Sequence, residues 1–323
     1  MSNLDTRPDE VTCEPEPGAG VEVLTPRDVP LGGPRAMRVR RTLPQRQRSL
    51  IGAWCFVDHY GPDRVADTGG MVVAPHPHTG LQTVSWLFSG EIQHRDSAGT
   101  AAVVRPGEVN LMTAGRGISH SEVSLPATTE LHGVQLWVAL PDVTRDGGPG
   151  FAHHAPGLVR RDGLAARVFL GSLLGETSPV TTHTPLLGAE LLLDPGARVR
   201  LDVDTTFEHG VLVDTGAVRA EGTDLAAADL GYLAPGRAVL DLEAGPDGAR
   251  VVLLGGPPFG EAIVMWWNFV GRTHDEVVAY RDAWQAQLVD GVQVDGRFGV
   301  VADEPLAPLP APELPNARLR TRS

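Results

Sequence analysis

Two short stretches of the sequence place residues that can bind metal two positions apart. The first is His76-Pro77-His78 and the second is His120-Ser121-Glu122. In an extended strand, residues i and i+2 point to the same side. Two such strands facing each other across a small barrel would present three imidazoles and one carboxylate to a single ion. That donor set suits a mononuclear transition metal with room for two further ligands.

A histidine pair of this kind has a simpler interpretation, because His-Pro-His can lie in a loop without binding metal. Eight of the eleven histidines fall between His59 and His154, however, and the two pairs lie about 40 residues apart in a β-rich half of the chain. The metal site and the loop remain alternatives at this level.

The elements that must position these residues are predicted to be β-strands. The chain has 38 Gly and 27 Pro, and between its ends most of them punctuate short apolar runs such as residues 80–89, 131–140 and 250–254. Short strands at regular, turn-punctuated spacing are typical of sandwiches and barrels. One segment differs, because Thr273 and Glu276 form a capping box before an apolar stripe at helical spacing, Val277, Tyr280, Trp284 and Leu288.

The composition limits the class of protein. A chain of 323 residues with 42% hydrophobic and 21% charged residues is long enough for about two globular domains. The net charge of −13 argues against a dedicated nucleic-acid binder. All basic residues are Arg, which excludes lysine Schiff-base chemistry. We expect no membrane span and no secretory signal, and the two cysteines, Cys13 and Cys55, cannot form a disulfide framework. A cytoplasmic protein is expected.

The longer motifs closely resemble the pirin family of the cupin superfamily. The resemblance rests on segments 56–62, 76–84, 94–97, 106–122 and 132–138, of which Met112-Thr-Ala-Gly-Arg-Gly-Ile-x-His-x-Glu122 is the most specific. It extends from about Arg38 to Gly299. Two positions depart from the family pattern, Leu81-Gln82 where Phe-Glu is usual and Trp266-Trp267-Asn268 before Phe-Val, which suggests a subgroup and weakens inference about the substrate.

The resemblance implies an all-β bicupin, two cupin β-barrels with a short C-terminal α-helix. We expect the following organisation: a mobile acidic tail (1–20), an N-terminal metal-binding barrel (21–150), a connecting segment (151–180), a C-terminal metal-free barrel (181–272), a helix and strand (273–300) and a Pro/Arg-rich tail (301–323). The second barrel has no His-x-His, and Arg200-Leu201-Asp202 stands roughly where a ligand pair would be. The family's ligands fall on His76, His78, His120 and Glu122, and imply one mononuclear ion, Fe(II).

Other residues have a functional and a structural interpretation. His94 and Asp96 either orient the ligands as a second layer or belong to a self-contained polar hairpin. Gln135 and Trp137, with His132, could line the cavity, although core packing is favoured for Trp137. His59 is expected to be structural. The arginine run Arg35–Arg48 contains no acidic residue and is either a contact patch or, as we favour, a locally paired strand face.

Two functions of different class follow. The first is a metal-dependent dioxygenase of the quercetin 2,3-dioxygenase type, which would take a flavonol-like small molecule and O2, with Glu122 as the base. The second is a redox-sensitive regulatory protein that binds a transcription factor or a metabolic enzyme, with no direct nucleic-acid or membrane contact. We expect a monomer in either case.

Overall fold

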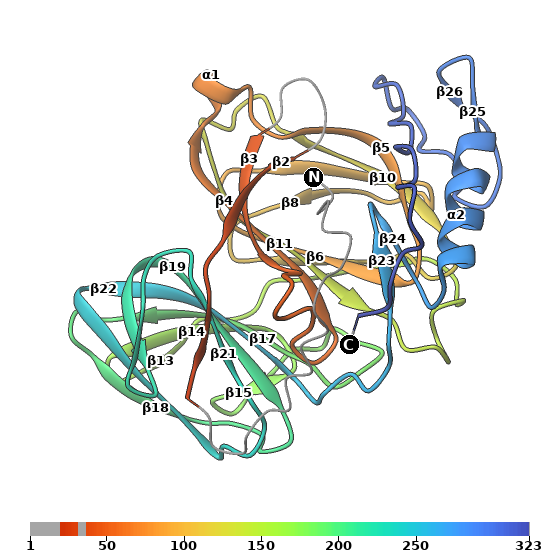
Figure 1. Cartoon of the computed structure of the whole chain (residues 1–323). Helices are drawn as coiled ribbons and strands as arrows, with labels where there is room; N and C mark the ends of the chain where they lie inside the picture. Colours follow the sequence, from red (N-terminus) through yellow and green to blue (C-terminus); the bar gives the residue numbers. More distant parts are fainter. Residues whose placement is uncertain (1–19, 32–36, 323) are drawn as a thin grey trace.

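The computed structural model describes residues 20–31 and 37–322, which form two lobes of β-sheet lying side by side (Figure 1). Nearly all of the expected acidic tail, residues 1–19, lies outside the described residues, as does Arg35. The first lobe carries most of the chain up to residue 154, and the second carries most of residues 159–256.

The first barrel is built from two antiparallel sheets. The seven-stranded sheet has the order β12-β9-β6-β11-β4-β3-β2 and the four-stranded sheet has the order β5-β10-β7-β8. The strands of the larger sheet are β2 (Arg27–Leu31), β3 (Met37–Leu43), β4 (Trp54–Arg64), β6 (Leu81–Ser89), β9 (Val109–Thr113), β11 (Glu130–Ala139) and β12 (Gly150–His154). Those of the smaller sheet are β5 (Val72–His78), β7 (Ile92–Asp96), β8 (Ala101–Val104) and β10 (Ile118–Ser124). A single helical turn, α1 (Val65–Thr68), follows β4.

The second barrel is one nine-stranded antiparallel sheet with the main order β1-β21-β19-β22-β17-β14-β13. Its strands are β1 (Glu22–Leu24), β13 (Val159–Arg161), β14 (Leu164–Leu170), β17 (Leu187–Leu193), β18 (Arg198–Asp202), β19 (Glu208–Ala220), β20 (Thr223–Leu225), β21 (Leu230–Leu233) and β22 (Val239–Gly256). Three small hairpins complete the fold: β15 (Ser172–Leu173) with β16 (Glu176–Thr177), β23 (Val264–Trp266) with β24 (Phe269–Gly271), and β25 (Leu288–Val289) with β26 (Val292–Gln293).

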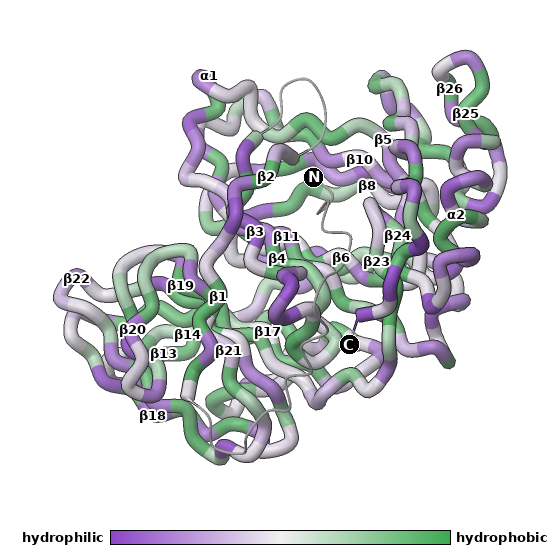
Figure 2. The backbone as a smooth tube through the Cα atoms, viewed as in Figure 1, coloured by the Kyte–Doolittle hydropathy of each residue, from purple (hydrophilic) through white to green (hydrophobic). Residues whose placement is uncertain are grey.

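Strand position explains the two kinds of hydrophobic pattern. In β18, buried and exposed residues alternate, as expected for a strand with one solvated face. In β6, residues 81–87 are all buried, because one face of this strand lines the first barrel and the other packs against the second. Hydrophobic stretches, green in Figure 2, accordingly lie in the strands on both sides of this junction.

One apolar core holds the two barrels together. Trp86 of the first barrel stacks on Phe169 of the second, with ring centroids 4.7 Å apart. The indole of Trp54 donates a hydrogen bond of 3.1 Å to the carbonyl oxygen of Gly255. Both tryptophans are fully buried, and this core also includes Leu136 and Leu254 from opposite sides. Apolar burial on this scale fixes the barrels against each other.

The C-terminal helix, α2 (His274–Ala286), begins where the capping box predicts. Thr273 Oγ1 accepts a hydrogen bond of 3.1 Å from the backbone N–H of Glu276, and Val277, Tyr280 and Trp284 are buried. The helix ends at Ala286, so Leu288 opens strand β25 and does not extend the helical stripe as expected. The helix, blue in Figure 1, lies on the outside of the first lobe.

Three segments contribute to barrels in a way that the expected boundaries did not include. β1, near the start of the chain, pairs with β21 of the second barrel. The expected connecting segment 151–180 supplies β12 to the first barrel and β13 and β14 to the second. Residues 301–322 follow the first barrel, where Leu309 N–H donates to Pro75 O and Arg322 forms a β-bridge with Ile263.

The all-β class, the two cupin barrels and the short C-terminal helix are confirmed. Within the described ranges, no helix has the length and hydropathy that crossing a membrane would require.

Candidate metal centre

Three neighbouring strands of the smaller sheet bring the predicted ligands together. His120 of β10 lies opposite His76 of β5 on one side and opposite Asp96 of β7 on the other. Glu122 lies opposite His94. The two ligand strands were expected to face each other across the barrel, but β5 and β10 are hydrogen-bonded neighbours in one sheet. A register shift between His120 and Glu122 marks a bulge, which locally re-aims the side chains.

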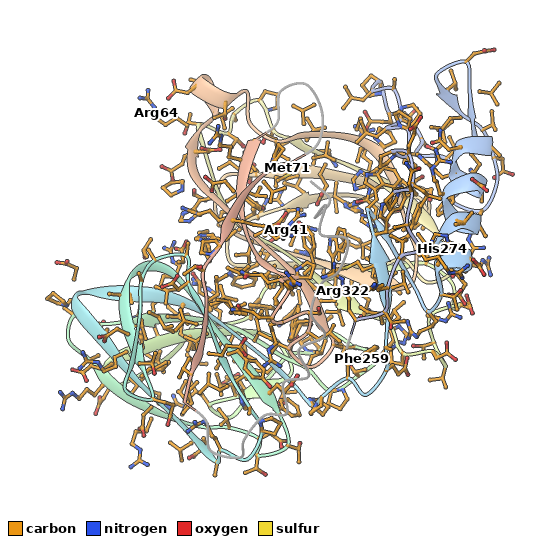
Figure 3. The ribbon with its side chains drawn as sticks, viewed as in Figure 1. Arg41, Arg64, Met71, Phe259, His274 and Arg322 are labelled. Atoms are coloured by element: carbon orange, nitrogen blue, oxygen red, sulfur yellow. The ribbon has the colours of Figure 1, made fainter. Side chains whose placement is uncertain are left out.

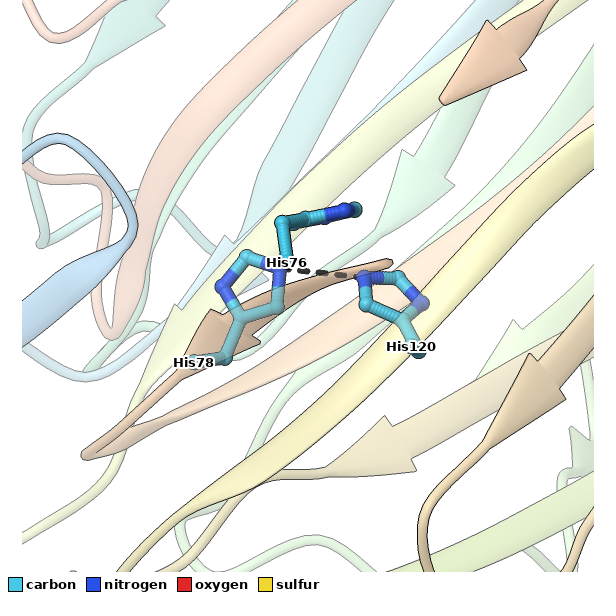
Figure 4. Close-up of side chains that lie close together, drawn as sticks. All are labelled: His76, His78 and His120. Carbon is cyan, nitrogen blue, oxygen red and sulfur yellow. Dashed lines mark hydrogen bonds between the residues drawn. The ribbon is translucent and has the colours of Figure 1, made fainter. Parts of the chain in front are cut away.

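His76, His78 and His120 form a tight group of imidazoles (Figure 4). The Nε2 atoms of His78 and His120 lie 3.0 Å apart, and the ring centroids of His76 and His120 lie 4.4 Å apart. Metal–nitrogen bonds are about 2.1 Å long, so two nitrogens at right angles around one ion lie about 3 Å apart. The spacing of His78 and His120 therefore fits two ligands of one ion.

The three imidazoles are held in the neutral form that metal binding requires. Burial lowers the pKa of His76 to about 4 and the pKa values of His78 and His120 well below the usual range for histidine. For His120, the neighbouring His76 and His78 lower it further. A neutral imidazole keeps a lone pair on one nitrogen, which is the form that binds a metal.

Glu122 belongs to a second, overlapping group with His94 and His120, whose ligand atoms all lie within 4.8 Å of one another. Burial raises the pKa of the Glu122 carboxyl. His94 Nδ1 lies 3.4 Å from His120 Nδ1, and its Nε2 lies 3.1 Å from Asp96 Oδ2. His120 is thus shared between the imidazole group and the carboxylate.

Asp96 has both of the roles that the sequence left as alternatives, since it closes a polar hairpin and also contacts an imidazole of the site. Its Oδ1 accepts hydrogen bonds of 2.9 Å from the backbone N–H groups of Ala98 and Thr100, which closes the β7–β8 turn. Its Oδ2 contacts His94 inside the barrel. The hairpin therefore holds itself together and also orients an imidazole beside Glu122.

The larger sheet provides the opposite wall. Trp137 stacks on Phe56, with centroids 4.0 Å apart, and meets His78 edge-on at 5.1 Å. Gln135 Oε1 accepts a hydrogen bond of 2.9 Å from Ser85 Oγ, which also lies 3.4 Å from Glu122 Oε1. Gln135 and Trp137 lie on one face of β11 beside the site. Ser85 and Phe56 were not predicted as site residues, because each lies in an apolar run that predicts only a β-strand.

A backbone group from beyond the second barrel also reaches the site. His78 Nδ1 lies 3.1 Å from the carbonyl oxygen of Asn268, in the turn between β23 and β24. Every residue has a backbone carbonyl, so residue types cannot predict this contact, and only the folded structure shows it. A hydrogen bond from the Nδ1–H fixes the tautomer and leaves the lone pair on Nε2, facing His120.

His132 does not lie beside the imidazole group, contrary to expectation. It lies on the other face of β11, where its Nε2 and that of His59 each lie 2.6 Å from Oδ1 of Asp214 in β19. All three side chains are buried between the barrels. Donor types alone would allow an ion here. However, Arg250 Nη1 lies 3.2 Å from Asp214 Oδ2, and Arg40 Nη2 lies 3.3 Å from His59 Nε2.

Two guanidinium groups beside this cluster disfavour a cation, and the O···N distances of 2.6 Å are those of short hydrogen bonds. We therefore interpret His59, His132 and Asp214 as a hydrogen-bonded junction between the barrels. The structural role expected for His59 agrees with this interpretation.

The described part of the arginine run makes several internal contacts. Arg41 forms a bidentate pair with the buried Asp58, at 2.6 and 2.7 Å, and stacks over Phe56 (Arg41 is labelled in Figure 3). Arg48 pairs with Glu22 at 2.6 Å. Arg41 of β3 thus has the local pairing expected of a strand face, whereas Arg48 pairs from the segment that follows β3.

Comparison with known proteins places this geometry in a family. The family model described as Pirin matches residues 36–138, and the Pirin C-terminal cupin domain matches residues 188–289. A "Pirin-like protein" of Caulobacter vibrioides is 36% identical over 263 residues, covering 77% of this chain and 88% of that protein. The chain belongs to the pirin family.

Two further proteins similar to this chain carry names that state an activity. A Pseudomonas aeruginosa protein named "Putative quercetin 2,3-dioxygenase PA1205" is 44% identical over 304 residues, covering 93% of each chain. The quercetin 2,3-dioxygenase from Acinetobacter baumannii, whose crystal structure is known, has 40% sequence identity to this chain. The two structures match with a TM-score of 0.86 over 93% of this chain and 97% of that one.

Proposed function

We propose that this pirin is a metal-dependent dioxygenase of the quercetin 2,3-dioxygenase type that holds one Fe(II) with His76, His78, His120 and Glu122. The observation that carries the proposal is the 3.0 Å separation of two neutral, buried imidazole nitrogens, with a carboxylate beside them. The names of the two relatives that share 40% and 44% identity support the activity.

Imidazole and carboxylate donors suit Fe(II), and four protein ligands leave two positions for substrate and O2. When bound, the iron would supply Lewis acidity and a template for a flavonol and O2. The residues of the chain would bind the substrate, take its proton and hold the ligands in position. Trp137, which stacks on Phe56, lies 5.1 Å from His78 and is the side chain against which an aromatic substrate would pack.

Glu122 would take the proton of the 3-hydroxyl group of the flavonol. It is the only carboxylate in the predicted ligand set, and it is buried, so bulk water competes weakly with the substrate. His94 and Asp96 would keep the His120 side of the site in place.

The test is oxygen uptake by the iron-loaded protein with quercetin, together with detection of released carbon monoxide. We expect quercetin-dependent uptake in the native chain and none in His78→Ala, which removes an imidazole without touching the barrel junction. Iron-loaded native protein that consumes no oxygen with any of a panel of flavonols would refute the activity.

The alternative, a regulatory protein that binds a protein partner, would use the arginine run. Arg40, Arg41 and Arg48 instead contact groups of this chain, Gly61 O, Asp58 and Glu22. We therefore retain the enzyme as the proposed function.

A further inference from the structure

A row of buried polar side chains crosses the inner face of the larger sheet of the first barrel. Asn110 of β9 lies opposite Ser85 of β6, and Ser85 lies opposite Gln135 of β11. All three are less than 10% exposed. The row separates two apolar clusters inside this barrel, one around Phe56 and Met112 and the other around Tyr60 and Leu87.

Ser85 is the member of this row that reaches the opposite sheet. Its Oγ lies 2.9 Å from Gln135 Oε1 and 3.4 Å from Glu122 Oε1 on β10. A hydroxyl has a single hydrogen, so Ser85 can donate it to Glu122 Oε1 when the Gln135 amide group turns its nitrogen toward Ser85 Oγ. In that arrangement the hydroxyl links the wall of the barrel to the carboxylate of the proposed metal site. Gln135 fixes the position of the hydroxyl, because it is buried beside Ser85 on the neighbouring strand.

We propose that Ser85 is a positioning residue that orients the Glu122 carboxylate toward the metal. This inference rests on the proposed metal site. A glutamate side chain has three rotatable bonds, so a carboxylate without a fixed partner can turn away from an ion. A contact to Oε1 restricts that rotation and leaves Oε2 for the ion.

The location of Ser85 argues against a purely structural hydroxyl. A residue between two apolar clusters would bury its surface best as Ala or Val, and a buried hydroxyl lowers stability unless it is hydrogen-bonded. Gln135 and Asn110 extend the polar row on either side of Ser85, and Asp58 of β4 continues it opposite Gln135. Ser85 is the member of this row that contacts Glu122.

The experiment measures Co²⁺ binding by the full chain, with a competing chelator for affinity and visible absorption for coordination. Ser85→Ala is compared with Ser85→Thr, which keeps the hydroxyl. The matched control is Ser121→Ala, because Ser121 is equally buried, precedes Glu122, and directs its hydroxyl away to Glu304. We expect Ser85→Ala to bind Co²⁺ about 10-fold more weakly with an altered spectrum, the usual effect of losing such a contact.

The control and the Thr variant should keep the native affinity and spectrum. Native Co²⁺ affinity and an unchanged spectrum in Ser85→Ala would overturn the inference. An equal loss in Ser121→Ala would also overturn it, since the effect would then be general destabilisation. His78→Ala separates this failure from failure of the proposed function: if His78→Ala also leaves Co²⁺ binding unchanged, the metal site itself is wrong.

Discussion

His78 Nδ1 lies 3.1 Å from the main-chain carbonyl oxygen of Asn268, so a turn that follows the second barrel orients an imidazole of the first. The same segment docks through a backbone hydrogen bond of 3.0 Å from Val270 N–H to Thr79 O. The geometry of the candidate metal centre therefore depends on the chain between β23 and β24 being held against the end of β5. This dependence can be tested at Gly80, which lies directly beneath the docked segment.

A Cβ at Gly80 would lie 2.2 Å from Val270 O, and the residue has a φ of +67°. Gly80→Ala should therefore push β24 away from β5, reduce stability and weaken metal binding by disturbing His78. The matched control is Gly196→Ala, where φ is +65° but nothing lies within 4 Å of the added Cβ. Both variants carry the left-handed strain of about 1–2 kcal/mol.

Urea unfolding and Co²⁺ titration of both glycine variants measure the difference. We expect a larger loss of stability in Gly80→Ala, and loss of Co²⁺ affinity only there. Equal affinity in the two variants would show that the docked turn does not set the geometry of His78.

Glu122→Gln keeps the size of the side chain but removes its charge and its capacity to act as a base. We expect weaker iron binding, and no oxygen uptake even at saturating iron. Circular dichroism should be unchanged, because the barrel core and not the ion holds the strands together. Full activity of the iron-loaded variant would remove the base role, and unchanged iron affinity would remove the ligand role.

Asp214→Asn tests the junction between the barrels. The carboxylate is fully buried and contacts His59, His132 and Arg250. Removing one partner of a buried charged network lowers stability by about 3 kcal/mol or more. The control Asp224→Asn breaks an exposed pair with Arg219 in the same barrel and should change stability little. Similar urea midpoints for the two variants would show that the contacts of Asp214 do not stabilise the junction between the barrels.

The stability of the metal-free protein should fall in mild acid partly because of His209. Burial lowers the pKa of His209 from 6.5 to about 4, against the opposing effect of Asp204. As pH falls below 6.5, the unfolded chain takes up a proton that the folded chain does not, so the free energy of unfolding decreases. This residue contributes a decrease of about 2 kcal/mol between pH 7 and pH 5.

His209→Gln should lessen that decrease, and the exposed His183→Gln serves as control. His209→Gln keeps every other histidine of the native chain, so the difference between these two proteins isolates His209. Parallel pH profiles of unfolding for the native chain and His209→Gln would contradict this prediction.

The sequence alone determined the strand-rich class, the two halves, the start of α2 and the residues of the candidate ligand pairs. These features depend on short-range rules. A period of two places His76 with His78 on one side of a strand, and a Thr-x-x-Glu box starts a helix whatever surrounds it. The expectation that His132 lines the site with Gln135 and Trp137 was wrong, because the odd spacing between His132 and these two residues puts them on opposite faces of β11.

Only the tertiary structure decided which strands became neighbours. It placed His94 beside Glu122, Ser85 across the barrel from the same carboxylate, and the Asn268 carbonyl against His78. It also assigned β1 to the second barrel. These contacts join residues as much as 210 positions apart, and their register depends on how the sheets close and on which faces find apolar partners. No local pattern encodes that choice, because it is made by the packing of the whole chain.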